Sequence, residues 1–135
     1  MVKKISHIAV AVFDVSEAAK FYEEKLGLKL GGREDVVGSK VTVGFIPVGE
    51  TRIELVQPAA PDSPITKFLE TRGPGLQHIC FEVDDVAAEL KRLDAAGVKL
   101  IDQIPHSGAH GTMVGFIHPS ATGGVLVELS QQMEK

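Results

Sequence analysis

HIAVAVFDV, at residues 7–15, recurs in this chain as HICFEVDDV at residues 78–86, 71 positions later (78 − 7). Both stretches begin with histidine and isoleucine and carry a valine, an aspartate and a second valine at matching positions. Each begins as a half-buried β-strand and ends in residues that typically start a helix. The recurrence therefore predicts two copies of one strand–helix unit.

Two further segments repeat at nearly the same offset. VGFI begins at Val43 and again at Val114, 71 positions apart (114 − 43). IEL at 53–55 matches VEL at 127–129 at an offset of 74 (127 − 53), because the second copy contains the longer loop HPSATGG. Agreement of separate segments at offsets within a few residues of one another indicates that the whole chain is a duplicated module.

Each copy is predicted to contain one helix after its first strand. Asp14 is a candidate N-cap with Glu17 three residues later, and Gly27 ends the apolar periodicity. Asp85 and Gly97 hold the matching positions in the second copy. Three strand-like segments follow in each copy, at 28–35, 40–49 and 52–56 and at 98–105, 112–119 and 125–130.

The segment between the copies, 58–74, is a proline-rich connector. It contains one short predicted helix, with Ser63 as the cap, Pro64 at the first helical position and Gly73 as the stop. The alternative is a loose linker between independent domains. A module of about 60 residues is marginal alone, so we expect the modules at 4–57 and 75–131 to share one curved sheet in a single domain, 1–135.

Composition restricts the function. The net charge of −4 gives no basic surface for nucleic acid, so we expect a small-molecule partner. Cys80 is the single cysteine, which excludes an internal disulfide and fits a reducing compartment. The N-terminal segment MVKKISHIAV has no apolar run long enough for a signal peptide or a membrane span. We therefore expect a cytoplasmic protein that is not bound to a membrane.

Two histidines and two glutamates occupy equivalent strand positions, His7 with His78 and Glu54 with Glu128. Each glutamate lies between apolar strand neighbours, and burying a carboxylate without a partner is costly. If both copies face one cleft, these four side chains converge. Two imidazoles and two carboxylates suit a divalent cation and leave two of six coordination positions for water or substrate.

Other interpretations exist for each residue. A strand histidine by itself is more often a packed or edge residue than a ligand, and either glutamate could lie on a solvated face. The paired repetition favours the metal site. Cys80 is predicted to be a small core residue and His118 to be structural. His106 and His110 lie in the glycine-flanked loop PHSGAHGTM, where substrate contacts and a plain surface turn are equally compatible with the sequence.

The duplicated module with its histidines and glutamates resembles the vicinal-oxygen-chelate superfamily. The resemblance implies an α+β fold in which two βαβββ modules form an open, cupped, eight-stranded mixed sheet around a metal. GPGLQHICFEVDDV, the GAHG loop, FIHP and GGVLVEL are similar to the methylmalonyl-CoA epimerase family in particular. That similarity runs from His7 to Gln131.

The resemblance implies a function. It predicts an isomerase that interconverts (2R)- and (2S)-methylmalonyl-CoA by removing and returning the C2 proton through a metal-stabilised enolate. The implied metal ligands are His7, Glu54, His78 and Glu128, with Glu128 also the acid/base group. Cobalt is the expected metal, with manganese, nickel, zinc or magnesium as alternatives, and a homodimer is expected.

Two positions depart from some members of the family. Some relatives have glutamine in place of Glu54, and some have a second catalytic glutamate where alignment places Thr42. Threonine is not a base at neutral pH, so a water held by Thr42, or His110 or Glu54, would have to replace that group. The lysines and arginines, Arg52 among them, are scattered and are expected to be solvated surface charges.

Two alternative functions remain open from the sequence. One is another metal enzyme of the superfamily, such as a glyoxalase I-like lyase. The other is a non-enzymatic ligand-binding module, which would not need all four candidate ligands.

Overall fold

The structure is a computed structural model that describes residues 1–133. It contains two compact units, which correspond to the two copies in the sequence. The first unit is His7–Gln77, and the second unit combines Met1–Ser6 with the residues from His78 onward. Eight strands are hydrogen-bonded in one sheet in the order β2-β3-β4-β1-β5-β8-β7-β6, with parallel and antiparallel pairs. The predicted α+β fold with an eight-stranded mixed sheet is confirmed.

The elements follow the predicted order in each copy. The first part of the chain forms β1 (Val2–Ala11), α1 (Val15–Lys20) with a π-helical turn at Phe21–Lys25, β2 (Gly32–Val36), β3 (Val41–Val48), β4 (Thr51–Pro58) and α2 (Pro64–Arg72). The second part forms β5 (Gly75–Val83), α3 (Val86–Ala95), β6 (His106–Ser107), β7 (Thr112–Ile117) and β8 (Val127–Gln132). Short 3₁₀ turns occur at Val37–Ser39, Ala109–Gly111 and Pro119–Ala121.

The predicted helix starts are confirmed. The Asp14 carboxylate accepts a hydrogen bond from the backbone N–H of Glu17 at 2.9 Å, and that of Asp85 accepts one from Ala88 at 3.0 Å. Ser63 caps α2 by accepting from the N–H of Ile65 at 3.2 Å. Each cap satisfies a backbone donor that has no partner within the helix, which fixes where the helix begins.

A glutamine side chain also binds the first backbone N–H of α1 and of α3, which is not predicted from the sequence. The Gln57 side chain accepts a hydrogen bond from the N–H of Val15 at 2.9 Å, and Gln131 accepts one from the N–H of Val86 at 3.0 Å. Gln57 and Gln131 are 74 positions apart (131 − 57), the offset already found for the glutamates. The duplication therefore preserves the link between each helix and the last strand of its own copy.

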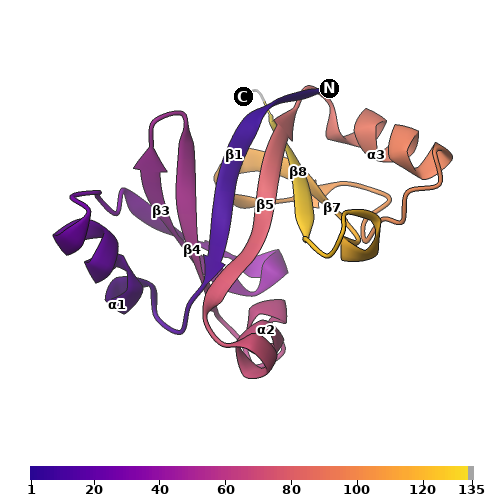
Figure 1. The fold of residues 1–135 in the computed structure, drawn as a ribbon. Helices are drawn as coiled ribbons and strands as arrows, with labels where there is room; N and C mark the ends of the chain where they lie inside the picture. The colour runs from indigo at the N-terminus through magenta and orange to yellow at the C-terminus, as the bar shows by residue number, and fades with distance from the viewer. Residues whose placement is uncertain (134–135) are drawn as a thin grey trace. The chain divides into compact units, whose positions relative to one another are not determined.

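One face of each half-sheet packs on a helix (Figure 1). Against α1, the buried core is Val12, Val15, Ala19, Ile46 and Leu55. Against α3, it is Val83, Val86, Leu90, Ile117 and Leu129. Burial of these apolar side chains is the main stabilising contribution in each unit. Because strand residues alternate between the two faces of a sheet, the strand neighbours of these core residues point to the face away from the helix.

The glycine of each VGFI segment has a packing reason. A Cβ added at Gly44 would lie 2.4 Å from Cγ1 of Val15, and one added at Gly115 would lie 2.6 Å from Cδ1 of Leu90. Real carbon atoms do not approach so closely. Glycine at these positions therefore lets each helix lie directly on the third strand of its copy.

The strand predicted at 98–105 is wrong. Within that segment only Leu100 forms an isolated bridge, to Ile117, and the strand that follows is limited to His106–Ser107. The carboxylate of Asp102 accepts the hydrogen bond from the N–H of Phe116 at 2.8 Å. A side chain thus takes the place of a backbone partner, and the ladder is interrupted at that point.

Candidate metal centre

Two of the four predicted ligands, His7 and Glu54, form an imidazole–carboxylate pair within the first unit. β1 and β4 run parallel, with Ala9 paired to Glu54, so Glu54 lies on the sheet face that carries Ala9 and His7. Nδ1 of His7 lies 3.2 Å from Oε2 of Glu54, and the side chains are 7% and 6% exposed. A carboxylate at this depth requires compensation, and the imidazole supplies part of it.

The second pair forms within the second unit by the same construction. β5 and β8 run parallel, with Cys80 paired to Glu128, so Glu128 shares its face with Cys80 and His78. Nε2 of His78 lies 2.9 Å from Oε1 of Glu128, and both side chains are 9% exposed. Each unit therefore brings one histidine together with one glutamate, at positions equivalent by the repeat.

A phenylalanine lies opposite each glutamate on the antiparallel neighbour strand, Phe45 on β3 and Phe116 on β7. The ring of Phe116 meets the imidazole of His78 edge to face, with centroids 5.3 Å apart. The matching positions Phe45 and Phe116 come from the two VGFI segments. The strand register therefore places an equivalent phenylalanine beside each of the two carboxylates.

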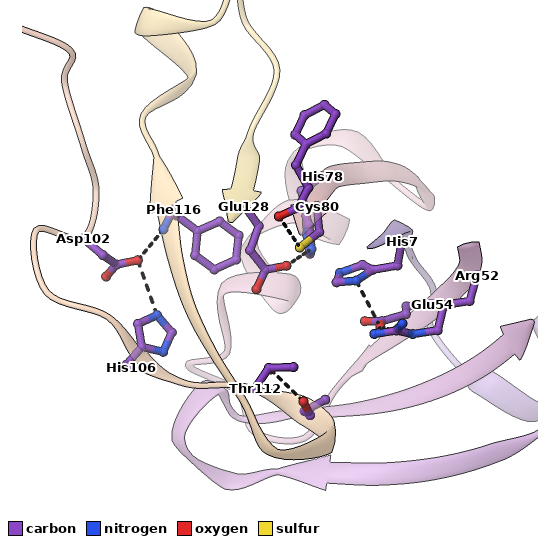
Figure 2. A network of polar contacts seen from close by, with 12 residues as sticks. His7, Arg52, Glu54, His78, Cys80, Asp102, His106, Thr112, Phe116 and Glu128 are labelled. Atoms are coloured by element: carbon purple, nitrogen blue, oxygen red, sulfur yellow. Dashed lines mark hydrogen bonds and ion pairs between the residues drawn. The ribbon is translucent and has the colours of Figure 1, made fainter. Parts of the chain in front are cut away.

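His106 belongs to the surroundings of the second pair. Its ring stacks on Phe116 with centroids 6.4 Å apart, and its Nε2 lies 3.3 Å from Oδ2 of Asp102 (Figure 2). Asp102 was not recognised from the sequence as part of this cluster. It is fixed by the hydrogen bond from the N–H of Phe116 described above. His106 is therefore an anchored side chain on the face that carries Glu128.

Arg52 is not the solvated surface charge expected from the sequence. Its Nε and Nη2 each lie 2.8 Å from Oε2 of Glu54, and its side chain is 26% exposed (Figure 2). Its guanidinium carbon lies 5.7 Å from the centre of the Phe45 ring. The sequence did contain an indication of this contact. Arg52 and Glu54 are two residues apart, and residues two apart on a strand share a face. Arg52 thus supplies a positive charge directly to Glu54.

Thr42 does not lie on the sheet face that carries Glu54. On β3 it pairs with Gln57, whereas Glu54 pairs with Phe45. Gln57 points toward the start of α1, so Thr42 lies on the helix side of the sheet, where its hydroxyl donates to Asp35 at 2.7 Å. A water held by Thr42 would lie on the wrong side of the strand. The expectation that a water held by Thr42 could replace the second catalytic glutamate is therefore wrong, and His110 and Glu54 stay as the candidates.

The structure also defines the surroundings of Cys80, His118 and His110. Cys80 is fully buried on β5, as predicted for a small core residue. His118 accepts a hydrogen bond from the N–H of Ser120 at 3.0 Å and caps the following 3₁₀ turn, which confirms its structural role. His110 is exposed and adopts φ +56° in the loop before β7, where its carbonyl accepts from Gln132.

The donor set fits a divalent cation. Each unit offers one imidazole nitrogen close to one carboxylate oxygen, and all four side chains are less than one tenth exposed. Imidazole and carboxylate are suitable ligands for first-row transition ions. Buried carboxylates that would otherwise be costly are also stabilised by a cation.

None of the helices in the described part of the chain is both long and apolar enough to cross a membrane.

The model of the Glyoxalase/Bleomycin resistance protein/Dioxygenase superfamily matches residues 4–129. The chain belongs to this superfamily, which is the vicinal-oxygen-chelate class predicted from its repeats. The match covers both copies of the module and all four candidate ligands.

Within this superfamily, the chain is similar to methylmalonyl-CoA epimerases. The chain is 42% identical over 133 residues to the ethylmalonyl-CoA/methylmalonyl-CoA epimerase of Cereibacter sphaeroides, covering 97% of this chain and 99% of the relative. The crystal structure of methylmalonyl-CoA epimerase from Mycobacterium tuberculosis has a TM-score of 0.93 and 32% identity, covering 98% and 90% of the two chains. A methylmalonyl-CoA epimerase in complex with methylmalonyl-CoA and NH4+ has a TM-score of 0.93 and 28% identity, covering 98% and 96%. The predicted similarity to this family, and the enzyme class of epimerase, are confirmed.

Proposed function

We propose that this chain epimerises methylmalonyl-CoA at C2 and that it requires a divalent metal for the reaction. The proposed substrate is supported by three similar proteins. Two of them are methylmalonyl-CoA epimerases and one is an ethylmalonyl-CoA/methylmalonyl-CoA epimerase. The reaction removes a proton from a carbon between a thioester carbonyl and a carboxylate and returns it on the other side.

His7, Glu54, His78 and Glu128 are proposed as the ligands of the metal. A bound divalent cation would act as a Lewis acid toward the thioester oxygen and so stabilise the enolate formed when the proton leaves. Glu128 is proposed to remove or return the C2 proton on one face of the enolate, and a second group, for which His110 and Glu54 are the candidates, is required on the other face. The position of Glu128 against Nε2 of His78 fixes one of its oxygens, which orients the carboxylate for proton transfer.

The observation that carries the proposal is the repeated buried pair. A single buried imidazole–carboxylate contact is common in protein cores, whereas two at equivalent positions require a reason that applies to both copies. Shared ligation of one cation supplies that reason and uses every member of both pairs. A ligand-binding module without chemistry would not need it.

The test is proton NMR of (2S)- and (2R)-methylmalonyl-CoA in D2O. The protein is first treated with a chelator, and the C2 proton signal is followed before and after addition of Co2+. We expect metal-dependent loss of this signal and appearance of the opposite epimer in a stereospecific coupled mutase assay. Absence of exchange with every divalent metal tested would refute the proposed substrate, and glyoxalase substrates would be tried next.

Four finer expectations remain predictions. Cobalt as the metal can be checked by competition with manganese, nickel, zinc and magnesium in the same assay. A homodimer can be checked by light scattering, and a cytoplasmic location by cell fractionation. The assignment of residues 1–135 to one domain predicts a single unfolding transition in calorimetry.

A further inference from the structure

Arg52 and Glu54 form a close ion pair within the first unit. Two nitrogens of the guanidinium, Nε and Nη2, each lie 2.8 Å from the same carboxylate oxygen, Oε2. Nδ1 of His7 approaches that oxygen as well, at 3.2 Å. Three contacts of the Glu54 carboxylate thus fall on a single oxygen, Oε2.

The arginine is held in this position by its surroundings. Arg52 and Glu54 are two residues apart on β4, so their side chains leave the same face of the strand. Phe45, which pairs with Glu54 across β3 and β4, provides a ring 5.7 Å from the guanidinium carbon. A planar guanidinium against an aromatic face loses less freedom than a lysine ammonium would in forming the ion pair.

The ion pair is a feature of one copy. The offset of 74 that relates Glu54 to Glu128 relates Arg52 to Leu126 (52 + 74). In the second unit the ring opposite the glutamate, Phe116, is instead stacked by His106. The duplicated framework therefore does not require a positive charge beside Glu54. The reason for Arg52 lies in the first unit itself.

We propose that Arg52 is a positioning residue that acts as the counter-charge of Glu54. This inference rests on the proposed metal site. With both glutamates ionised, the four ligands carry two negative charges, which strengthens cation binding and opposes the approach of an anionic substrate. Arg52 offsets one of these charges, so a cation is held less tightly and the carboxylate of the substrate meets less repulsion.

The test is calorimetric titration of chelator-treated protein with Co2+ alone. Arg52→Gln removes the positive charge and is expected to tighten Co2+ binding by about fivefold or more. Arg52→Lys keeps the charge but loses the planar contact with the ring, so its Co2+ affinity should lie between those of the wild type and Arg52→Gln. The matched control is Arg72→Gln, because Arg72 also stacks on a ring, that of Phe68 at 5.5 Å, and lies outside the proposed site.

A double-mutant cycle separates the counter-charge from a general packing effect. In a Glu54→Gln background no carboxylate holds the guanidinium, so Arg52→Gln should change Co2+ affinity by less than about twofold. The KM for methylmalonyl-CoA is expected to rise severalfold in Arg52→Gln, with a smaller change in kcat. It should return toward the wild-type value when Glu54→Gln is added.

Each outcome has a defined meaning. Unchanged or weaker Co2+ binding in Arg52→Gln, with a folded variant by circular dichroism, overturns the counter-charge. So does an equal shift in both backgrounds. If wild-type protein binds no divalent cation and exchanges no C2 proton, the proposed function itself has failed. If Arg52→Gln does not fold, the comparison of Arg52→Lys with Arg72→Gln decides, and weaker binding in Arg52→Lys alone overturns the proposal.

Discussion

Nε2 of His78 lies 2.9 Å from Oε1 of Glu128, and these two side chains, each 9% exposed, come from strands that run parallel to each other. A contact of this kind fixes the orientation of both groups. The equivalent contact in the first unit, between His7 and Glu54, has the same residue types but a longer distance of 3.2 Å. The two halves of the proposed ligand set are therefore similar in chemistry and different in detail.

His78→Ala is expected to abolish metal binding while the fold is retained. Loss of a residue that only supports a ligand typically costs 10- to 100-fold in metal affinity, so loss of a ligand should cost at least about 100-fold. Metal content after dialysis, measured by mass spectrometry of the elements, checks this, with circular dichroism as the control for folding. A fully metallated and active variant would contradict the shared site.

Glu128→Gln tests the acid/base role separately from the metal. Glutamine keeps an oxygen ligand but does not accept the C2 proton, so kcat is expected to fall by about 10²- to 10⁴-fold. The measurement is the rate of C2 proton exchange in D2O, made on protein whose metal content is shown to match the wild type. Wild-type turnover in this variant would remove Glu128 from the proton transfer.

Gly115→Ala is expected to destabilise the second unit. The new methyl group would lie 2.6 Å from Cδ1 of Leu90, so α3 or β7 must shift. Overpacking of this kind typically lowers the free energy of unfolding by about 1–3 kcal/mol. Urea denaturation measures the change. The control is Gly32→Ala on β2, where nothing lies within 4 Å of the added carbon; an equal effect of both substitutions would show that packing on Leu90 is not the cause.

Gln131→Ala removes the side-chain acceptor at the start of α3. The N–H of Val86 loses its partner at 3.0 Å, which is expected to lower the free energy of unfolding by about 1–2 kcal/mol. Thermal and urea unfolding check the value. Gln103→Ala serves as the comparison, because that exposed side chain makes a long contact of 3.5 Å with Asp94. Equal stability of the two variants would mean that Gln131 does not support the helix.

Glu89 predicts a pH dependence of stability. Hydrogen bonds from Arg92, and then from the amino group of Met1, hold the pKa of this carboxyl below its ordinary value of 4.5. The ionised form is therefore favoured in the folded protein. The stabilisation is complete above the pKa of the unfolded chain, fades as the pH falls below about 4.5, and is lost below the folded pKa.

Glu89→Gln should thus lower the free energy of unfolding at pH 7 by no more than about 1 kcal/mol, because its partners are exposed. At a pH below the folded pKa of Glu89 the variant and the wild type should be equally stable. Urea denaturation over a series of pH values gives both quantities. A difference that persists undiminished in acid would assign the effect to something other than the charge.

Much of the architecture could be predicted from local sequence. The repeated segments identified two copies, and Asp14, Ser63 and Asp85 marked the helix starts because capping depends on residues close in the chain. The four candidate ligands were found by the same repeat, together with strand alternation. The segment at 98–105 was predicted wrongly, since its composition favours a strand but the Asp102 side chain takes the hydrogen bond of Phe116.

The sequence by itself therefore determined the duplication, the fold class and the four candidate histidine and glutamate side chains, since these depend on spacing and on local chemistry. Only the tertiary structure decided that Thr42 lies on the helix side of β3 and that Arg52 binds Glu54. Both facts depend on strand register, where a shift of one residue exchanges the two faces. Register is set by the packing of whole strands against α1 and α3 and by backbone pairing between distant segments.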